Sequence, residues 1–177
     1  MKGKWGRVMT ELSYFAYGSN LHPLRLHARL PAARFKQIGY ISGYRLNYGM
    51  RGRDASAKCN LIYTGSDADF CYGAVYSLQV NEKLILDEHE RHYDTHTVEV
   101  LIDRRLQSCF TYIAQAEHQT DSLLPFSWYR DIVCHGGRFL GFPESYIEHL
   151  ENTDVQIDPD EERRLLHERL IEDIRTD

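Results

Sequence analysis

The sequence lacks any apolar run that approaches the ~20 consecutive residues of a membrane-spanning helix. Its first twelve residues, MKGKWGRVMTEL, are basic but do not contain the apolar stretch of a secretory signal. With 42% apolar and 27% charged residues, the chain also differs from collagen-like and disordered sequences. We therefore expect a globular protein that is located in the cytoplasm and has no membrane partner.

Cysteine is scarce as well, because the 177 residues contain four, which are Cys59, Cys71, Cys109 and Cys134. They lie far apart and form no C-x-x-C pair, so we expect reduced, buried side chains rather than a disulfide framework. Repeats, low-complexity tracts and flexible linkers are also missing before about residue 152. A chain of this length can bury one sizeable core. We expect one domain over residues 1–151, followed by an extension over residues 152–177.

Charge is unevenly distributed along the chain. The segment 151–177 holds ten acidic residues against four arginines, whereas residues 22–58 hold eight lysines and arginines and only one acid, Asp54. The basic segment indicates either a solvated face or attraction for an anionic ligand. It has no recognition helix or RNA-binding motif, so we expect no nucleic-acid partner.

Short segments rich in aromatic and β-branched residues predict strands, and they are separated by Gly, Asp or Ser turns. They cover residues 13–17, 35–48, 59–64, 70–79, 96–102 and 108–114. Helical patterns begin near His22, at residue 81 with Asn81 as N-cap, at Pro125 with an end at Gly136 and Gly137, and at Pro143. About six strands with helices around them predict an α+β fold.

The extension predicts one more helix, over residues 159–174, with Asp158 as N-cap and Pro159 in the first position. Leu166, Leu170 and Ile174 share one face of this helix because they are spaced by four residues. We expect this apolar stripe to pack on the chain's own domain, with a surface for a partner as the alternative.

Two features carry the candidate chemistry. The segment Tyr17-Gly18-Ser19-Asn20 ends a strand and enters a helix, so its backbone N–H groups can converge on an anion, with Gly18 permitting the bend. Glu90 follows Leu86 by four residues and therefore shares an apolar stripe, where desolvation raises a carboxyl pKa toward that of a general base. The alternatives are an ordinary turn and a surface glutamate. Asp87 and Glu88 are expected to face solvent.

The sequence resembles the γ-glutamylcyclotransferase-like family over about residues 13–151. The resemblance rests on YFAYGSNL at 14–21, GYRLNYG at 43–49, YGAVYSL at 72–78, LDEHE at 86–90, TYIA at 111–114 and the PFSWY to GFPESY series at 125–146. The pair formed by Tyr-Gly-Ser-Asn-Leu and a downstream Leu-Asp-x-x-Glu is much more specific than either half. The resemblance implies a small closed mixed β-barrel with flanking helices and a pocket between the loop and the acidic helix.

The resemblance also implies roles for individual residues. Glu90 is the general acid/base, and the substrate is held by Tyr17, Gly18, Ser19, Asn20, Leu21 and Tyr129. The implied reaction cyclises a γ-glutamyl compound to 5-oxoproline and releases an amine or amino acid, with neither metal nor organic cofactor. One position departs from the family pattern, because Arg91 follows Glu90 where many relatives have glycine. This departure bears on the identity of the substrate.

The sequence offers three alternatives to this function, which are a metal site, a catalytic Cys–His pair and a non-catalytic binding module. His89, His92 and His96 straddle a helix end and a strand start, which is a poor spacing for metal ligands. Cys134 and His135 are adjacent in a predicted helix and therefore point about 100° apart, unlike a catalytic Cys–His pair. A non-catalytic small-molecule binding module of the same fold is the remaining alternative, and the presence of Glu90 argues against it. The oligomeric state is left open.

Overall fold

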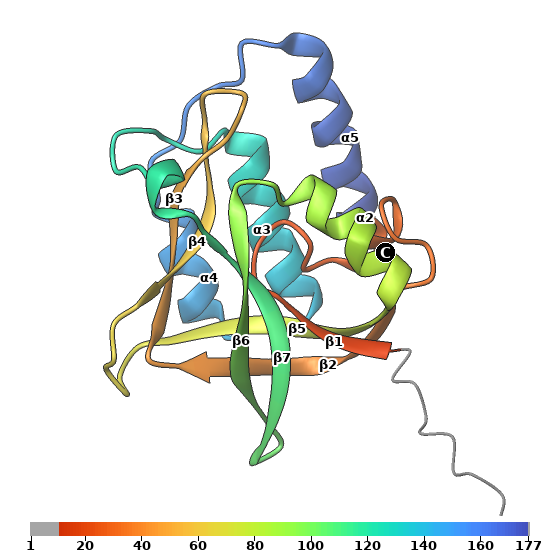
Figure 1. The fold of residues 1–177 in the computed structure, drawn as a ribbon. Coiled ribbons are helices and arrows are strands. Elements are labelled where there is room, and N and C mark those ends of the chain that lie inside the picture. Colours follow the sequence, from red (N-terminus) through yellow and green to blue (C-terminus); the bar gives the residue numbers. More distant parts are fainter. Residues whose placement is uncertain (1–10, 177) are drawn as a thin grey trace, which may run out of the picture.

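The computed structural model describes residues 11–176, and its centre is a closed barrel of five strands (Figure 1). The strands follow the order β1-β5-β2-β6-β7, with antiparallel pairing except where β7 meets β1 in parallel through Phe110 and Tyr14. Their bounds are Glu11–Ala16 (β1), Arg34–Ser42 (β2), Phe70–Gln79 (β5), Tyr93–Ile102 (β6) and Arg105–Ala114 (β7). The predicted α+β fold with a closed mixed barrel is confirmed.

Two further strands form a separate antiparallel sheet that extends away from the barrel (Figure 1). They are β3 (Tyr44–Arg51) and β4 (Ala57–Tyr63). The prediction of one strand over residues 35–48 is wrong, because Gly43 has a φ of 77° and breaks the segment into β2 and β3. Glycine adopts this left-handed conformation without the steric cost that a side chain would add. The barrel therefore has five strands rather than about six.

Helix α2 (Val80–His89) follows β5 without a loop. Its N-cap is Gln79 in a capping box with Glu82, which corrects the prediction of Asn81 as the cap and of a helix over residues 81–92. Glu82 Oε1, the carboxylate oxygen that is not part of the capping box, accepts a hydrogen bond from Ala32 N at 3.0 Å and ties the helix to the loop before β2. The helix ends before Glu90, which becomes its C-cap.

Helix α3 (Ser127–Phe139) continues through Gly136 and Gly137, so the prediction that these glycines end it is wrong. A Cβ atom at Gly136 would lie 3.0 Å from Leu21 Cβ, and one at Gly137 would lie 2.5 Å from Ile147 Cδ1. Both glycines are thus explained by close packing. They bring α3 against the loop after β1 and against α4 (Glu144–Glu151). The short helices α1 (Pro23–His27) and η1 (Ala116–His118) complete this part of the fold.

Helix α5 (Glu161–Thr176) begins two residues later than predicted. Its first N–H groups are capped by Asp160, whose Oδ1 accepts from Arg163 N at 3.0 Å, rather than by Asp158. Leu166 is 63% exposed and does not belong to the packed stripe, whereas Ile171 and Ile174 are buried. The helix packs against α3, so the expectation that it packs on its own chain is confirmed (Figure 1).

The four cysteines are free and buried, as predicted. Within residues 11–176, no helix is long and apolar enough to cross a membrane. Residues 1–10, which carry most of the segment expected to lack a secretory signal, lie outside the described residues.

Candidate active site

The end of β1 opens into a small buried pocket of about 40 Å³. Side chains from three barrel strands, from β4, from α3 and from the loop after β1 surround it. The lining residues are Tyr14, Tyr17, Gly18, Ser19, Asn20, Cys59, Glu90, Tyr93, Tyr112 and Tyr129. Six of the seven residues predicted for the site therefore meet in one place. We call this cavity the inner pocket.

Glu90 is the carboxylate of the inner pocket, and the end of α2 fixes its backbone. Its N–H donates to Leu86 O at 3.0 Å, and its carbonyl accepts from Tyr93 N at 2.9 Å. The Oε1 atom accepts a hydrogen bond from Asn20 Nδ2 at 3.3 Å and lies 3.9 Å from Arg29 Nη1. The side chain is 17% exposed. Glu90 is therefore held next to the loop, but it has few close donors.

Burial raises the pKa of the Glu90 carboxyl above its ordinary value. The charges of Arg29 and Arg25 and the hydrogen bond from Asn20 act in the opposite direction and only partly offset burial. A carboxyl group with a raised pKa can accept a proton and return it in the same reaction cycle. This is the electrostatic property that a general acid/base requires.

The loop after β1 presents backbone to the pocket. Leu21 N donates to Gly18 O at 3.1 Å and closes a tight turn. Within residues 11–176, the N–H groups of Ser19 and Asn20 have no acceptor, so they are available to a ligand. The backbone of Gly18 is not left-handed, which corrects the expectation that glycine permits the bend. Glycine is needed for space, because a Cβ atom there would lie 3.0 Å from Cys59 Cβ.

Tyrosine hydroxyls hold the inner pocket together. Tyr129 OH accepts from Cys59 N at 3.1 Å, Tyr93 OH donates to Cys59 O at 2.7 Å, and Tyr17 OH donates to Tyr112 O at 2.6 Å. Burial raises the pKa of Tyr17, Tyr93 and Tyr129 well above the ordinary value, so these groups are neutral hydroxyls. The hydrogens of Tyr17 OH and Tyr93 OH are already donated to carbonyl oxygens, so of the three only Tyr129 OH can donate to a substrate oxygen. None of the three can serve as a base near neutral pH.

Leu21 is the predicted site residue that the structure places elsewhere. Its side chain is 2% exposed and packs near Gly136 of α3, and its carbonyl accepts from Tyr76 OH at 2.7 Å. Its N–H is already used in the turn with Gly18. Leu21 therefore anchors the loop in the core and does not line the inner pocket.

The Asp87 side chain is 38% exposed and faces solvent in part, as expected, but its carboxylate is also bound by neighbouring side chains. Its Oδ1 accepts from Tyr112 OH at 2.6 Å and from Lys83 Nζ at 2.8 Å. Tyr112 lines the inner pocket, so Asp87 supports one of its walls. Glu88 is exposed, as expected.

The histidines predicted as poor metal ligands lie apart from one another. His89 and His96 are exposed, and His92 Nδ1 faces His118 Nδ1 at 3.0 Å. Among residues 11–176, no group of three or more His, Cys, Asp or Glu side chains is arranged to hold a metal ion. Cys134 is buried in α3, and its pKa is raised to about 12 by burial, so its thiol is not a nucleophile at neutral pH.

A larger cleft of about 370 Å³ continues outward from the inner pocket. Ser19, Glu90, Tyr93 and Tyr129 line both cavities. We call this second cavity the outer cleft. Its other walls include Arg25 from α1, Arg29 from the loop after α1, and Arg163 and His167 from α5. Arg25 and Arg29 belong to the basic segment 22–58, whose sequence fitted either a solvated face or an anionic ligand. Nothing in the sequence of the extension indicated Arg163 or His167.

Comparisons with known proteins agree with this geometry. Residues 71–150 match the AIG2-like family. The chain is 27% identical over 155 residues to a γ-glutamylcyclotransferase of Mus musculus, covering 85% of this chain and 82% of the relative. It is 29% identical over 146 residues to one of Homo sapiens, covering 78% and 76%. A solved γ-glutamyl cyclotransferase structure superposes with a TM-score of 0.78 at 23% identity, covering 92% of this chain and 99% of that chain. The resemblance to the γ-glutamylcyclotransferase-like family is thereby confirmed.

Proposed function

We propose that this chain is a γ-glutamylcyclotransferase-type enzyme, which converts a γ-glutamyl compound to 5-oxoproline and releases an amine or amino acid. The observation that carries the proposal is the position of Glu90. This carboxylate lies in a buried pocket, within hydrogen-bond reach of Asn20 in the loop after β1, and has a raised pKa. Relatives that are named γ-glutamylcyclotransferase in mouse and human support the same reaction.

In this mechanism, Glu90 moves one proton between the two nitrogen atoms of the substrate. The carboxylate takes a proton from the α-ammonium group, and the free amine attacks the γ-carbonyl carbon to form a five-membered ring. The bond from this carbon to the original amide nitrogen then breaks, and Glu90 returns the proton to the departing amine. The ring nitrogen loses its second proton to the released amine, which departs as an ammonium ion, so that 5-oxoproline has a neutral lactam N–H. Because nucleophile and carbonyl belong to one molecule, ring closure benefits from proximity. Neither a metal nor an organic cofactor takes part in these steps.

The remaining site residues orient the glutamyl end. The free N–H groups of Ser19 and Asn20 suit the α-carboxylate of the substrate. Tyr129 is a neutral hydroxyl whose oxygen accepts from Cys59 N, and such a donor stabilises the oxyanion that forms at the attacked carbonyl. Gly18 permits the approach of the loop to Cys59. With the glutamyl end anchored at the inner pocket by its α-carboxylate, the rest of the substrate extends into the outer cleft.

The test is direct. The purified protein is incubated with a panel of γ-glutamyl amino acids, γ-glutamyl amines and glutathione-like peptides, and 5-oxoproline is measured by mass spectrometry. We expect 5-oxoproline from at least one member in an amount equal to the released amine. Binding of a γ-glutamyl compound without turnover would instead favour a binding module of the same fold.

We further propose that the substrate is a small molecule in the cytoplasm and that residues 1–151 form the catalytic domain. Fractionation of cells and activity of a chain truncated after residue 151 test these points. Because Arg163 and His167 line the outer cleft, truncation is expected to alter the rate even if the shorter chain folds.

A further inference from the structure

Two buried nitrogen atoms in the walls of the outer cleft have no hydrogen-bond partner within residues 11–176. They are Arg25 Nε, from α1, and His167 Nδ1, from α5. Buried polar groups are paired in almost all native proteins, so two unpaired nitrogen atoms in one cleft are suited to a partner that a ligand supplies. Burial, with a smaller effect from the charge of Arg25, lowers the pKa of the His167 imidazole to about 4 and leaves it neutral at neutral pH. Because both side chains line the same cleft, one small molecule can contact both.

Arg25 also differs in its ion pairing from the other partly buried cations of the outer cleft. Lys58 is paired with Asp54 at 2.8 Å, Arg163 with Asp158 at 2.5 Å, and Arg29 lies 3.9 Å from Glu90. Arg25 has no carboxylate partner in the described part of the chain. Burial and the charge of Arg29 lower its pKa to about 10, which leaves it charged at neutral pH. A charged, partly buried guanidinium group without a counterion favours an anionic ligand.

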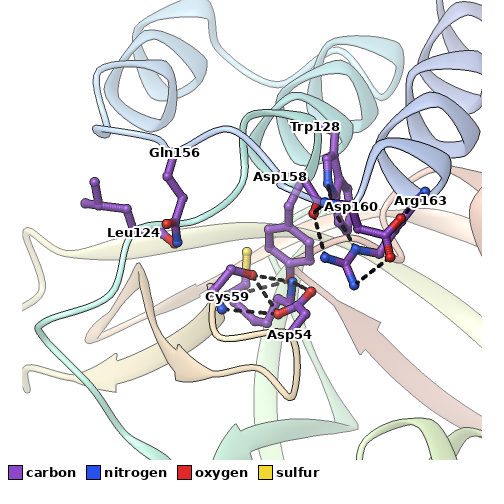
Figure 2. Close-up of polar contacts among 11 residues, drawn as sticks. Asp54, Cys59, Leu124, Trp128, Gln156, Asp158, Asp160 and Arg163 are labelled. Atoms are coloured by element: carbon purple, nitrogen blue, oxygen red, sulfur yellow. Dashed lines mark hydrogen bonds and ion pairs between the residues drawn. The ribbon is translucent and has the colours of Figure 1, made fainter.

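His167 is held rigidly in its position. Its ring stacks on Trp128 with 3.8 Å between centroids. Trp128 Nε1 donates to Asp158 Oδ2 at 2.8 Å, and Asp158 in turn binds Arg163 of α5 (Figure 2). This contact fixes the first turns of α5 on α3. The imidazole is thus a preorganised group of the cleft wall, and not a mobile surface side chain.

The charge of the outer cleft supports the same ligand class. Its lining includes seven lysines and arginines but only three carboxylates. The cations are Arg25, Arg29, Arg51, Arg53, Lys58, Arg91 and Arg163, and the carboxylates are Asp54, Glu88 and Glu90. A cleft with this excess of positive charge concentrates anions. Arg91 adds to this excess at the exposed rim.

We propose that Arg25 and His167 form a specificity subsite for a carboxylate on the side chain of the departing amino acid. The inference rests on the proposed function, because the glutamyl end must occupy the inner pocket for the amine side to reach this subsite. The preferred substrates are γ-glutamyl dipeptides whose second residue is acidic. The subsite does not enter the bond changes, since Glu90 transfers the proton and the subsite only binds the departing group.

The test compares two substrates of nearly identical shape, γ-glutamyl-glutamate and γ-glutamyl-glutamine. Only the first has a charged side chain on the amine side. We expect kcat/KM of the wild type to favour γ-glutamyl-glutamate by roughly 10- to 100-fold at low ionic strength, which is the effect of one charge-assisted hydrogen bond. The readout is 5-oxoproline formation from each substrate.

Three variants and one control identify the residues that cause the preference for γ-glutamyl-glutamate. Arg25→Gln and, on the other wall, His167→Phe should each reduce the ratio of the two kcat/KM values at least several-fold, and the phenyl ring keeps the stacking on Trp128. Arg25→Lys should retain part of the ratio because it keeps the charge. Arg105→Gln is the matched control, because Arg105 is exposed at the start of β7 and does not line the outer cleft. It should keep the full ratio.

Each outcome decides between the two proposals. Equal turnover of both dipeptides by the wild type would overturn the subsite and leave the proposed function intact. A strong preference that persists in both Arg25→Gln and His167→Phe would overturn the assignment to these residues. Failure to form 5-oxoproline from any γ-glutamyl compound would overturn the proposed function and the subsite with it. Circular dichroism spectra verify that each variant is folded.

Discussion

Glu90 and Asp158 are two buried carboxylates with opposite surroundings. Asp158 accepts hydrogen bonds from Trp128 Nε1 at 2.8 Å, from Arg163 Nε at 2.7 Å and from Asp160 N at 3.0 Å (Figure 2). Glu90 accepts one hydrogen bond, of 3.3 Å, from Asn20. The guanidinium of Arg163 and the indole N–H hold the pKa of Asp158 well below its ordinary value, whereas burial raises the pKa of Glu90.

This difference distinguishes Asp158, a carboxylate that stabilises the fold, from Glu90, a carboxylate that is available for catalysis. Asp158 has its acceptor sites filled, and this arrangement joins α5 to α3. Glu90 is desolvated without full compensation, which costs stability and leaves acceptor sites for a ligand. Both groups are acidic residues outside the barrel strands. Their roles differ because their neighbours differ.

The largest expected effect is on catalysis at Glu90. Glu90→Gln keeps the shape and hydrogen-bonding reach of the side chain but cannot take up the ammonium proton. We expect kcat to fall by roughly 10²- to 10⁴-fold, with substrate affinity largely retained. Steady-state kinetics with the best γ-glutamyl substrate measures this. Equal activity in the variant and the wild type would show that Glu90 is not the base.

The control for this experiment is Glu148→Gln, because Glu148 is exposed on α4 and lines neither the inner pocket nor the outer cleft. Its charge is screened by solvent, so the rate should change little. Asp87→Asn is not a neutral control, since Asp87 accepts the hydroxyl hydrogen bond of Tyr112 at 2.6 Å. We expect an intermediate loss of activity for this variant.

The next effect is on stability at Asp158. Asp158→Ala leaves Trp128 Nε1 without its acceptor and removes the partner of Arg163. We expect the free energy of unfolding to fall by about 2–4 kcal/mol, in the range for breaking a buried hydrogen-bonded pair. Urea unfolding measures the loss. A change below about 0.5 kcal/mol, which is typical of surface substitutions, would contradict the structural role.

The smallest effect is on the pH dependence of stability, where the two carboxylates should act with opposite signs. The depressed pKa of Asp158 contributes stability above its unfolded value of 3.8, and this is lost as the pH falls below it. The raised pKa of Glu90 costs stability while the group is ionised, and this cost disappears as the pH falls through the folded-state pKa toward 4.5.

Urea unfolding from about pH 7 down to about pH 3 tests these signs in Asp158→Asn and Glu90→Gln. On acidification, the free energy of unfolding of the wild type should rise relative to that of Glu90→Gln. The wild type should lose stability below pH 3.8 in the comparison with Asp158→Asn. Parallel pH curves for the wild type and both variants would show that the two environments are alike after all.

The sequence alone determined much of the local structure and of the inner pocket. Segments rich in aromatic and β-branched residues predicted the positions of the five barrel strands, with β2 merged with β3, and the paired motifs brought Glu90 and the loop after β1 to one pocket. These features depend on residues near each other in the chain or on a specific family resemblance. Helix ends were predicted less well. Gly136 and Gly137 were predicted to end a helix, but they lie inside α3. Glycine occurs there because Leu21 and Ile147 pack closely against these positions.

Only the tertiary structure decided which charged groups are desolvated. Arg25 and His167 are ordinary polar residues of their local segments, and no periodicity distinguishes Arg25 from Arg34. Glu90 shares the stripe of Leu86, but that spacing does not show which donors surround its carboxylate. The three residues meet because β1 closes the barrel and α5 docks on α3, which brings segments more than 60 residues apart in the sequence to one cleft. Burial, ion pairing and pKa depend on that surrounding volume, and local sequence does not specify it.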